Sequence, residues 1–346
     1  MKKIILITFT FLITANLLIA QNIKFKNDSV KHYIDKTLLT IQDNALNKNK
    51  INWEALRIDI YEKTKSTNNV QEILFIYPYL FQKIEDHHGW LSYKNKNYRW
   101  NKESRTQDND IVKDAVKKYK DVYSTLLNKN IGYLRIPGNN DFSATKMDSI
   151  ASNIVDEIDK INSTKIKGWI IDLRINTGGN MYPMIAGISE LIGNNEKIGG
   201  FINSDNQSEG EWFLKNGNVY VDSNQVLDSQ KLEKPIKKQL PIAVLISGYT
   251  ASSGEMTAIS LIGRNKTKLF GEESAGYTTT NQGFKIDENS GLNLAVDYVT
   301  DRTGKIYVEN IKPDFEVISG DDFENLKYDK KIVESLKWLK KETVNR

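Results

Sequence analysis

The chain contains no cysteine. This absence excludes disulfide bonds, thiol chemistry, cysteine metal sites and a lipid-attachment cysteine. Histidine is scarce as well: only His32, His87 and His88 occur, so any histidine-dependent chemistry must use one of them. Positive and negative side chains are interspersed around a formal charge of +4, which gives no patch of the kind that attracts nucleic acid. We expect no metal, no other cofactor and no nucleic-acid partner.

The amino terminus reads Met1, Lys2, Lys3 and continues with an almost uninterrupted apolar run, residues 4–20. A short positive segment, an apolar run and a small residue at its end are typical of a secretory signal peptide. We therefore expect residues 1–20 to be a cleaved signal peptide and the protein to be periplasmic or secreted, with no stable membrane association after cleavage. The alternative is an uncleaved anchor, because the apolar run is near the minimum length of a membrane span.

The remaining sequence divides into three regions. Residues 21–89 carry apolar side chains at helical spacing, such as Trp53, Leu56 and Ile60, which predicts a small amino-terminal helical domain. Residues 90–130 turn polar and predict a connecting segment with a short helix around 111–127. Residues 131–346 alternate apolar strands with amphipathic helices and predict an α/β (α+β) core.

Within that core the pattern predicts individual elements. Expected strands are 131–136, 168–175, 242–246, 268–270, 292–299 and 306–308. Expected helices are 147–161, 181–192, 252–262 and one at the carboxy terminus. The dipeptide Asn216-Gly217 predicts a hairpin.

The motif Thr250-Ala-Ser-Ser-Gly-Glu255 joins a buried strand to an apolar helix through small residues. Small residues permit a sharp turn that exposes Ser252 at the helix start, where nearby amides, including that of Ser253, can donate to a developing oxyanion. The motif therefore indicates a nucleophilic serine. The competing interpretation is a capping box, in which Ser252 and Glu255 only satisfy amides of the first helical turn.

A second motif, Asp172-Leu-Arg-Ile-Asn-Thr-Gly-Gly179, ends another buried strand in paired glycines. Gly178 and Gly179 allow a bare backbone amide to approach a substrate oxygen, although glycine pairs also occur in ordinary turns. A third motif, Asp86-His-His-Gly89, holds two of the three histidines and so offers a base for the serine. A solvated or capping histidine pair is the alternative, and two adjacent histidines alone make a poor metal site.

Taken in order, these motifs resemble the S41 serine peptidases, which include the carboxy-terminal processing (tail-specific) proteases and the tricorn core protease. The resemblance implies a core like that of crotonase and the Clp protease (ClpP), residues 131–346, behind the helical domain. Tail-specific members have a lysine base after the segment that is here Gly271-Glu-Glu-Ser-Ala-Gly276, but Tyr277 follows it in this chain. Lys285 is a weaker substitute for that lysine, and the peptide-binding PDZ insert is absent.

The tricorn-like branch instead uses a histidine base and a glutamate shortly before a Pro-Asp pair, here Pro313-Asp314. The resemblance thus implies Ser252 as nucleophile, His88 as general base and Glu309 as its partner. It further implies an oxyanion hole of the amides of Ser253, Gly178 and Gly179. Supporting roles fall to His87, Glu255 and Tyr277.

The function that follows is an exported serine peptidase acting on a peptide or unfolded protein through a Ser252 acyl-enzyme. The alternative on the same fold is a non-catalytic binding module for an apolar ligand or peptide, with aromatic residues such as Trp212, Phe213 and Tyr277 in its pocket. Hydrolysis of a non-peptide ester or amide is a third candidate, because an oxyanion site does not identify the leaving group.

Overall fold

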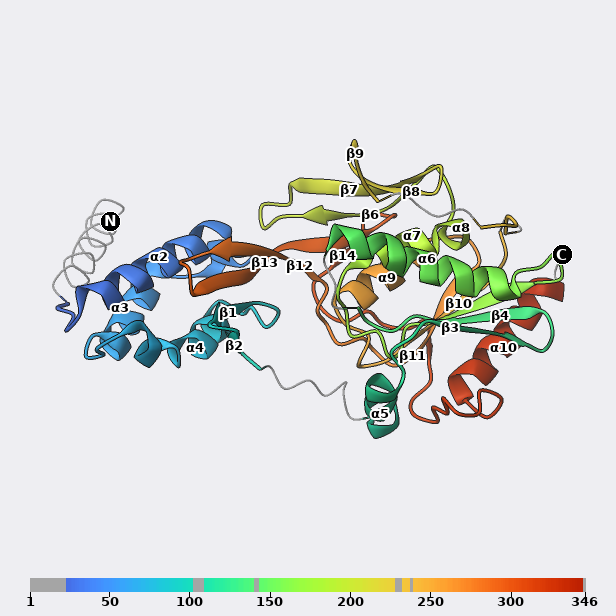
Figure 1. The fold of residues 1–346 in the computed structure, drawn as a ribbon, viewed down its shortest axis with the longest axis horizontal. Helices are drawn as coiled ribbons and strands as arrows, with labels where there is room; N and C mark the ends of the chain where they lie inside the picture. The colour runs from blue at the N-terminus through green and yellow to red at the C-terminus, as the bar shows by residue number, and fades with distance from the viewer. Residues whose placement is uncertain (1–22, 102–108, 140–142, 228–231, 237–238, 345–346) are drawn as a thin grey trace, which may run out of the picture. The chain divides into compact units, whose positions relative to one another are not determined.

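The computed structural model describes residues 23–101, 109–139, 143–227, 232–236 and 239–344 (Figure 1). The predicted signal peptide, residues 1–20, lies outside them. In the described part of the chain no helix is long and apolar enough to cross a membrane. The described residues form two compact units, of which the first comprises 23–101, 203–205 and 280–297 and the second the remainder.

The first unit is built on helices, as the apolar spacing predicts. Asparagine side chains start three of them: Asn27 accepts from Ser29 N, Asn52 from Ala55 N and Asn69 from Glu72 N. The helices are α2 (Asp28–Asn44), η1 (Lys48–Lys50), α3 (Trp53–Thr64), η2 (Val70–Ile73) and α4 (Ile76–Lys83).

A hairpin from much later in the chain completes this unit. Strand β12 (Thr279–Lys285) pairs with β13 (Ser290–Asp301), which pairs antiparallel with β1 (Trp90–Tyr93), and β1 pairs with β2 (Lys96–Tyr98). Ile286, Leu292 and Leu294 of the hairpin region join the buried cluster of the helices. The core of the helical unit therefore depends on residues more than 200 positions away.

The second unit contains a six-stranded sheet in the order β15-β11-β10-β5-β4-β3, parallel except for β3. Its strands are β3 (Tyr123–Leu127), β4 (Ile131–Arg135), β5 (Gly168–Asp172), β10 (Ile242–Ile246), β11 (Thr267–Gly271) and β15 (Phe315–Glu316). Its helices are α5 (Asp110–Lys118), α6 (Ala144–Ile161), α7 (Met181–Gly187), α8 (Ser189–Ile192), α9 (Ser253–Leu261) and α10 (Lys330–Val344).

The three central strands β4, β5 and β10 are buried at every position. Alternate residues face opposite layers: Leu134 and Ile171 belong to the cluster that includes α6, α7 and α9, whereas Tyr133 and Ile170 belong to the cluster that includes α10. Helices on both faces explain why these strands read as continuous apolar runs. The predicted mixed α/β fold is confirmed.

A second set of strands in this unit is antiparallel. The carboxy-terminal end of β13 pairs with β6 and β14, and β6 to β9 follow one another in order. The bounds are β6 (Glu196–Ile202), β7 (Ser208–Lys215), β8 (Asn218–Val221), β9 (Asn224–Leu227) and β14 (Ile306–Tyr307). The predicted hairpin at Asn216-Gly217 is the turn between β7 and β8.

Two predicted helices differ from the structure. The helix expected over 111–127 is wrong beyond Lys118, because residues 123–127 form β3 and pair with β4. Tyr123 and Thr125 favour strand, and a partner strand is available. The helix expected over 181–192 is divided at Ile188 into α7 and α8.

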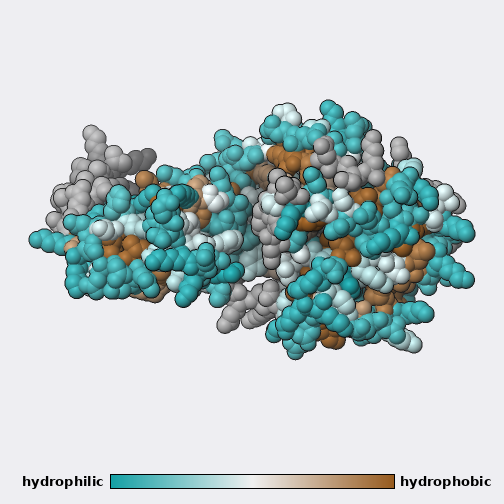
Figure 2. Space-filling model, in the orientation of Figure 1, coloured by the Kyte–Doolittle hydropathy of each residue, from teal (hydrophilic) through white to brown (hydrophobic). Residues whose placement is uncertain are grey.

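On the face drawn in Figure 2 hydrophilic residues predominate, in keeping with the interspersed charges of the sequence.

Candidate active site

Ser252 lies at a sharp turn between β10 and α9. Its backbone has φ +52° and ψ −118°, a conformation that non-glycine residues rarely adopt. Two hydrogen bonds fix the turn to the end of β5: Thr250 Oγ1 donates to Leu173 O at 2.9 Å, and Ala251 N donates to Asn176 O at 2.9 Å. The hydroxyl-bearing residue is thus presented, half-exposed, at the amino-terminal end of a buried helix.

The paired glycines lie against this turn. A Cβ on Gly178 would come within 2.9 Å of the Ser252 Cβ, and one on Gly179 would overlap the Asn139 carbonyl oxygen at 1.2 Å. Both glycines have positive φ, +105° and +123°. No other residue type fits at either position, so the two motifs that the sequence singled out meet in space.

The backbone amides beside Ser252 differ in what they bind. Gly178 N donates to Asn176 Oδ1 at 3.1 Å, within its own loop. Ser253 N and Gly179 N have no acceptor among the residues that the structure describes. Ser253 Oγ donates to Gly179 O at 2.6 Å and so ties the glycine loop to the start of α9. Two amides next to a serine hydroxyl can stabilise an oxyanion.

Glu255 is fully buried three residues after Ser252. Its carboxylate accepts from Ser252 N at 2.8 Å, Gly276 N at 2.9 Å, Tyr277 N at 2.8 Å and the Ser274 hydroxyl. Burial raises its pKa to about 7, although these hydrogen bonds favour the charged form. Glu255 therefore does more than cap a helix, since it holds the Ser252 turn and the 274–277 loop together. Tyr277 contributes to this arrangement through its backbone N–H, which donates to Glu255.

The histidine motif belongs to the first unit. Asp86 is buried and accepts from His88 N at 3.0 Å, Gly89 N at 2.6 Å and Ala295 N at 3.0 Å. Burial raises the pKa of Asp86, partly offset by these amides. His88 is half-buried, and His87 packs edge-on against Trp100 with ring centroids 6.3 Å apart.

The sequence did not single out Asn281 of β12. Its Nδ2 donates to the His88 carbonyl oxygen at 2.9 Å, and its Oδ1 is buried without a hydrogen-bond partner in the described part of the chain. A lone asparagine in a polar strand gives no motif to detect. Only the pairing of the β12–β13 hairpin with β1 makes it a neighbour of the histidines.

The other residues that the sequence pointed to form no hydrogen bond or ion pair with the Ser252 turn in the part of the chain that the structure describes. Glu309 is exposed, its backbone oxygen accepts from Thr278 Oγ1 at 2.8 Å, and its carboxylate has no partner among the described residues. Lys285 forms an exposed ion pair with Glu288 at 2.8 Å. Trp212 is fully buried beside Phe201, so it cannot line an open pocket. Ser252 and Glu309 belong to the second unit and His87 and His88 to the first.

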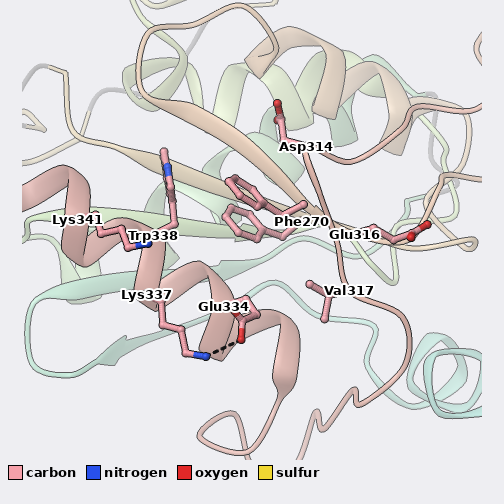
Figure 3. Close-up of a pocket in the computed structure, with 9 residues that line it drawn as sticks. Phe270, Asp314, Glu316, Val317, Glu334, Lys337, Trp338 and Lys341 are labelled. Atoms are coloured by element: carbon pink, nitrogen blue, oxygen red, sulfur yellow. Dashed lines mark hydrogen bonds and ion pairs between the residues drawn. The ribbon is translucent and has the colours of Figure 1, made fainter.

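A hollow of about 450 Å³ lies elsewhere in the second unit, between β15 and α10 (Figure 3). Phe270, Phe315 and Trp338 form its aromatic part, and Glu334 pairs with Lys337 at its rim at 2.7 Å. It contains neither Ser252 nor the glycine loop. Among the described residues no group of three or more acidic or histidine side chains is arranged to hold a metal ion.

A serine on a strained strand-to-helix turn, packed against two glycines at the end of a neighbouring strand, is an arrangement that acyl-transfer hydrolases use. The family model of peptidase family S41 matches residues 130–317, and the chain belongs to this family. The predicted family is thereby confirmed, and the protein is a serine-type peptidase.

Two relatives and one solved structure are similar to this chain over different shares of their length. It is 28% identical to the nisin-resistance protein of Lactococcus lactis subsp. lactis over 85% of this chain and 86% of that one. It is 31% identical to the carboxy-terminal processing protease CtpA of Bacillus subtilis (strain 168) over 56% of this chain but only 36% of that one. The solved structure of a lipoprotein from Streptococcus agalactiae matches with a TM-score of 0.68 and 25% identity, over 90% of this chain and 96% of that one.

Proposed function

We propose that the protein is an exported peptidase that hydrolyses peptide bonds through a Ser252 acyl-enzyme, with His88 as the general base. The observation that carries the proposal is the strained Ser252 turn, held against glycines and beside the Ser253 and Gly179 amides. Strain of this kind persists only where surrounding contacts impose it, and it is concentrated at functional sites.

The reaction needs two proton transfers in each half. His88 takes the proton of Ser252 Oγ as the oxygen attacks the peptide carbonyl carbon, and the Ser253 and Gly179 amides stabilise the resulting oxyanion. The imidazolium then protonates the leaving amine, and the C–N bond breaks. A water attacks the acyl-enzyme as His88 accepts its proton; His88 then returns a proton to Ser252 Oγ while the ester C–O bond breaks and the carboxylic acid leaves.

Glu309 is proposed as the partner of the imidazolium, on the basis of its place before Pro313-Asp314. The loss of such a partner lowers kcat by up to about 10⁴-fold in serine proteases. Gly178 is proposed to act through its close approach to Ser252, since its own amide is used within the loop.

The substrate is proposed to be a peptide or an unfolded protein segment. Nisin merits a place among the substrates tested, because the nisin-resistance relative is covered over nearly its whole length. Export is proposed from the leader, residues 1–20. Amino-terminal sequencing of protein recovered outside the cytoplasm should find a start near Gln21, and an intact Met1 there would contradict cleavage.

The decisive experiment uses a fluorophosphonate probe, which phosphonylates an activated serine with loss of fluoride. Ser252 should be the labelled residue by mass spectrometry, and Ser252→Ala should abolish labelling. His88→Ala should slow labelling at least 100-fold, because the serine then lacks a base.

The other histidines provide matched controls. His32→Ala removes an exposed histidine of α2 and should leave the labelling rate within threefold of wild type. A wild-type labelling rate in His88→Ala with a large loss in His87→Ala would identify His87, not His88, as the base. Wild-type labelling in both variants would rule out a histidine base.

A further inference from the structure

The main chain of His88 is held on both sides by side chains. Asp86 accepts from its N–H at 3.0 Å, and Asn281 donates to its carbonyl oxygen at 2.9 Å. Asp86 in turn accepts from Ala295 N, so the turn is fastened to both strands of the β12–β13 hairpin. A backbone fixed in this way limits the positions that the half-exposed imidazole can reach.

Asn281 has a second feature that packing does not explain. Its Oδ1 is buried and has no donor among the described residues. An unsatisfied buried acceptor lowers the stability of a fold, so retaining one indicates a use. Exchanging the oxygen and nitrogen of the amide would not remove the conflict, because Oδ1 would then face the His88 carbonyl oxygen, which cannot donate.

We propose that Asn281 is the positioning residue of the catalytic base. The inference rests on the proposed function, in which His88 takes the serine proton. Through Nδ2, Asn281 fixes the backbone of His88; through Oδ1, it offers an acceptor to the imidazole. A neutral imidazole that takes the serine proton on one ring nitrogen carries its N–H on the other, so an acceptor at that second nitrogen fixes the tautomer that can act as a base.

This role is independent of Glu309. Asn281 belongs to the same compact unit as His88, whereas Glu309 belongs to the other. Asn281 therefore holds the base whether or not substrate is present, and the role proposed for Glu309 is a separate one.

The test compares Asn281→Ala and Asn281→Asp with Gln282→Ala, the neighbouring exposed residue of β12. The fluorophosphonate labelling rate and the final labelled fraction are measured separately. Both Asn281 variants should label at least 10-fold more slowly, yet reach the wild-type final fraction. Asn281→Asp keeps the size and the acceptor but has no N–H for the His88 carbonyl, so it should not restore the rate. Gln282→Ala should match wild type.

A spectroscopic readout separates positioning from a general loss of structure. The chain has three histidines, so long-range ¹H–¹⁵N spectra resolve each ring. Asn281→Ala should change the tautomer pattern of His88 and leave that of His32 unchanged. If the alanine variant does not fold, Asn281→Leu, which has a similar size but neither the N–H nor the acceptor, provides the same measurement.

Three results would overturn the proposal: Asn281 variants labelled within threefold of the wild-type rate, a slower rate fully explained by a smaller labelled fraction, or an unchanged His88 spectrum. Normal labelling of Asn281→Ala beside impaired His88→Ala would remove only the positioning role. Normal labelling of His88→Ala would remove the proposed function and this inference together.

Discussion

Ser252 combines a nucleophile with a backbone conformation that favours glycine. Two sets of contacts impose φ +52°. Thr250 and Ala251 donate hydrogen bonds to the segment that follows β5, and Glu255 accepts from Ser252 N. An L-residue in such a region stores on the order of 1–3 kcal/mol. The turn is therefore less stable than a relaxed one, and it presents the half-exposed Ser252 hydroxyl.

The strain predicts a difference between two inactive variants. Ser252→Gly should unfold with a free energy about 1 kcal/mol higher than Ser252→Ala, because glycine adopts positive φ without a Cβ clash. Urea unfolding of both proteins checks this. Equal stabilities, or a more stable alanine variant, would mean that the turn is not strained.

Glu255 makes stability depend on pH. A carboxyl whose pKa is raised on folding stabilises the fold while protonated, so its contribution is complete below its ordinary pKa of 4.5 and is lost as pH rises through about 7. The shift corresponds to about 3 kcal/mol. From pH 4.5 to 7 the free energy of unfolding should therefore fall by about this amount in wild type relative to Glu255→Gln.

The matched control is Glu334→Gln, an exposed carboxylate of α10, which should show the wild-type slope. A wild-type slope in Glu255→Gln would contradict the assignment. The glutamine variant should also lose activity. Its NH₂ group would face N–H or O–H groups that donate to the Glu255 carboxylate, and two donors cannot bond to each other.

At the scale of elements, a buried ion network joins three segments behind the glycine loop. Arg174, after β5, pairs with Asp172, Asp321 and Asp329, each at 2.6 Å. Lys331 of α10 pairs with Asp321 at 2.7 Å and with Glu272, after β11, at 2.9 Å. The loop that carries Gly178, the loop that carries Ser274 and the start of α10 are thereby held in one arrangement.

Breaking this network should be costly. Arg174→Met leaves the buried Asp172 and Asp329 without a cation and Asp321 with Lys331 alone, so it should lower the free energy of unfolding by about 3–5 kcal/mol. Lys337→Met removes an exposed cation of α10 and should change it by about 0.5 kcal/mol or less. Denaturant unfolding of the two variants checks the contrast. A small effect of Arg174→Met would show that the carboxylates are solvated or protonated without cost.

For the whole molecule, the two units have separate hydrophobic cores. Leu38 of α2 is buried in the core of the first unit, and Ile158 of α6 in the main core of the second. Strand β13 contributes residues to both units. Separate cores favour separate unfolding steps.

Calorimetry should accordingly show two transitions. Leu38→Ala and Ile158→Ala should each destabilise one unit by about 2–5 kcal/mol and shift a different transition. A single transition that both variants shift alike would show that the units unfold as one.

Much of the second unit follows from its sequence. The uninterrupted apolar strands 168–172 and 242–246 require cover on both faces, and the small residues after them predicted the turns that carry Gly178, Gly179 and Ser252. Tyr123 to Leu127 were misassigned because their strand conformation depends on pairing with β4. The local sequence pattern predicted the secondary structure correctly where a strand is buried on both faces. It failed where the conformation depends on pairing with another strand.

The sequence by itself determined the family, the serine turn, the facing glycines and the histidine pair, because these depend on residue types at short spacing. Only the tertiary structure decided what surrounds them. Asn281 meets His88 across 193 positions, and Asp321 meets Arg174 across 147. Such contacts are set by which strands pair and which loops return to the sheet, and neither residue type nor local periodicity encodes that choice.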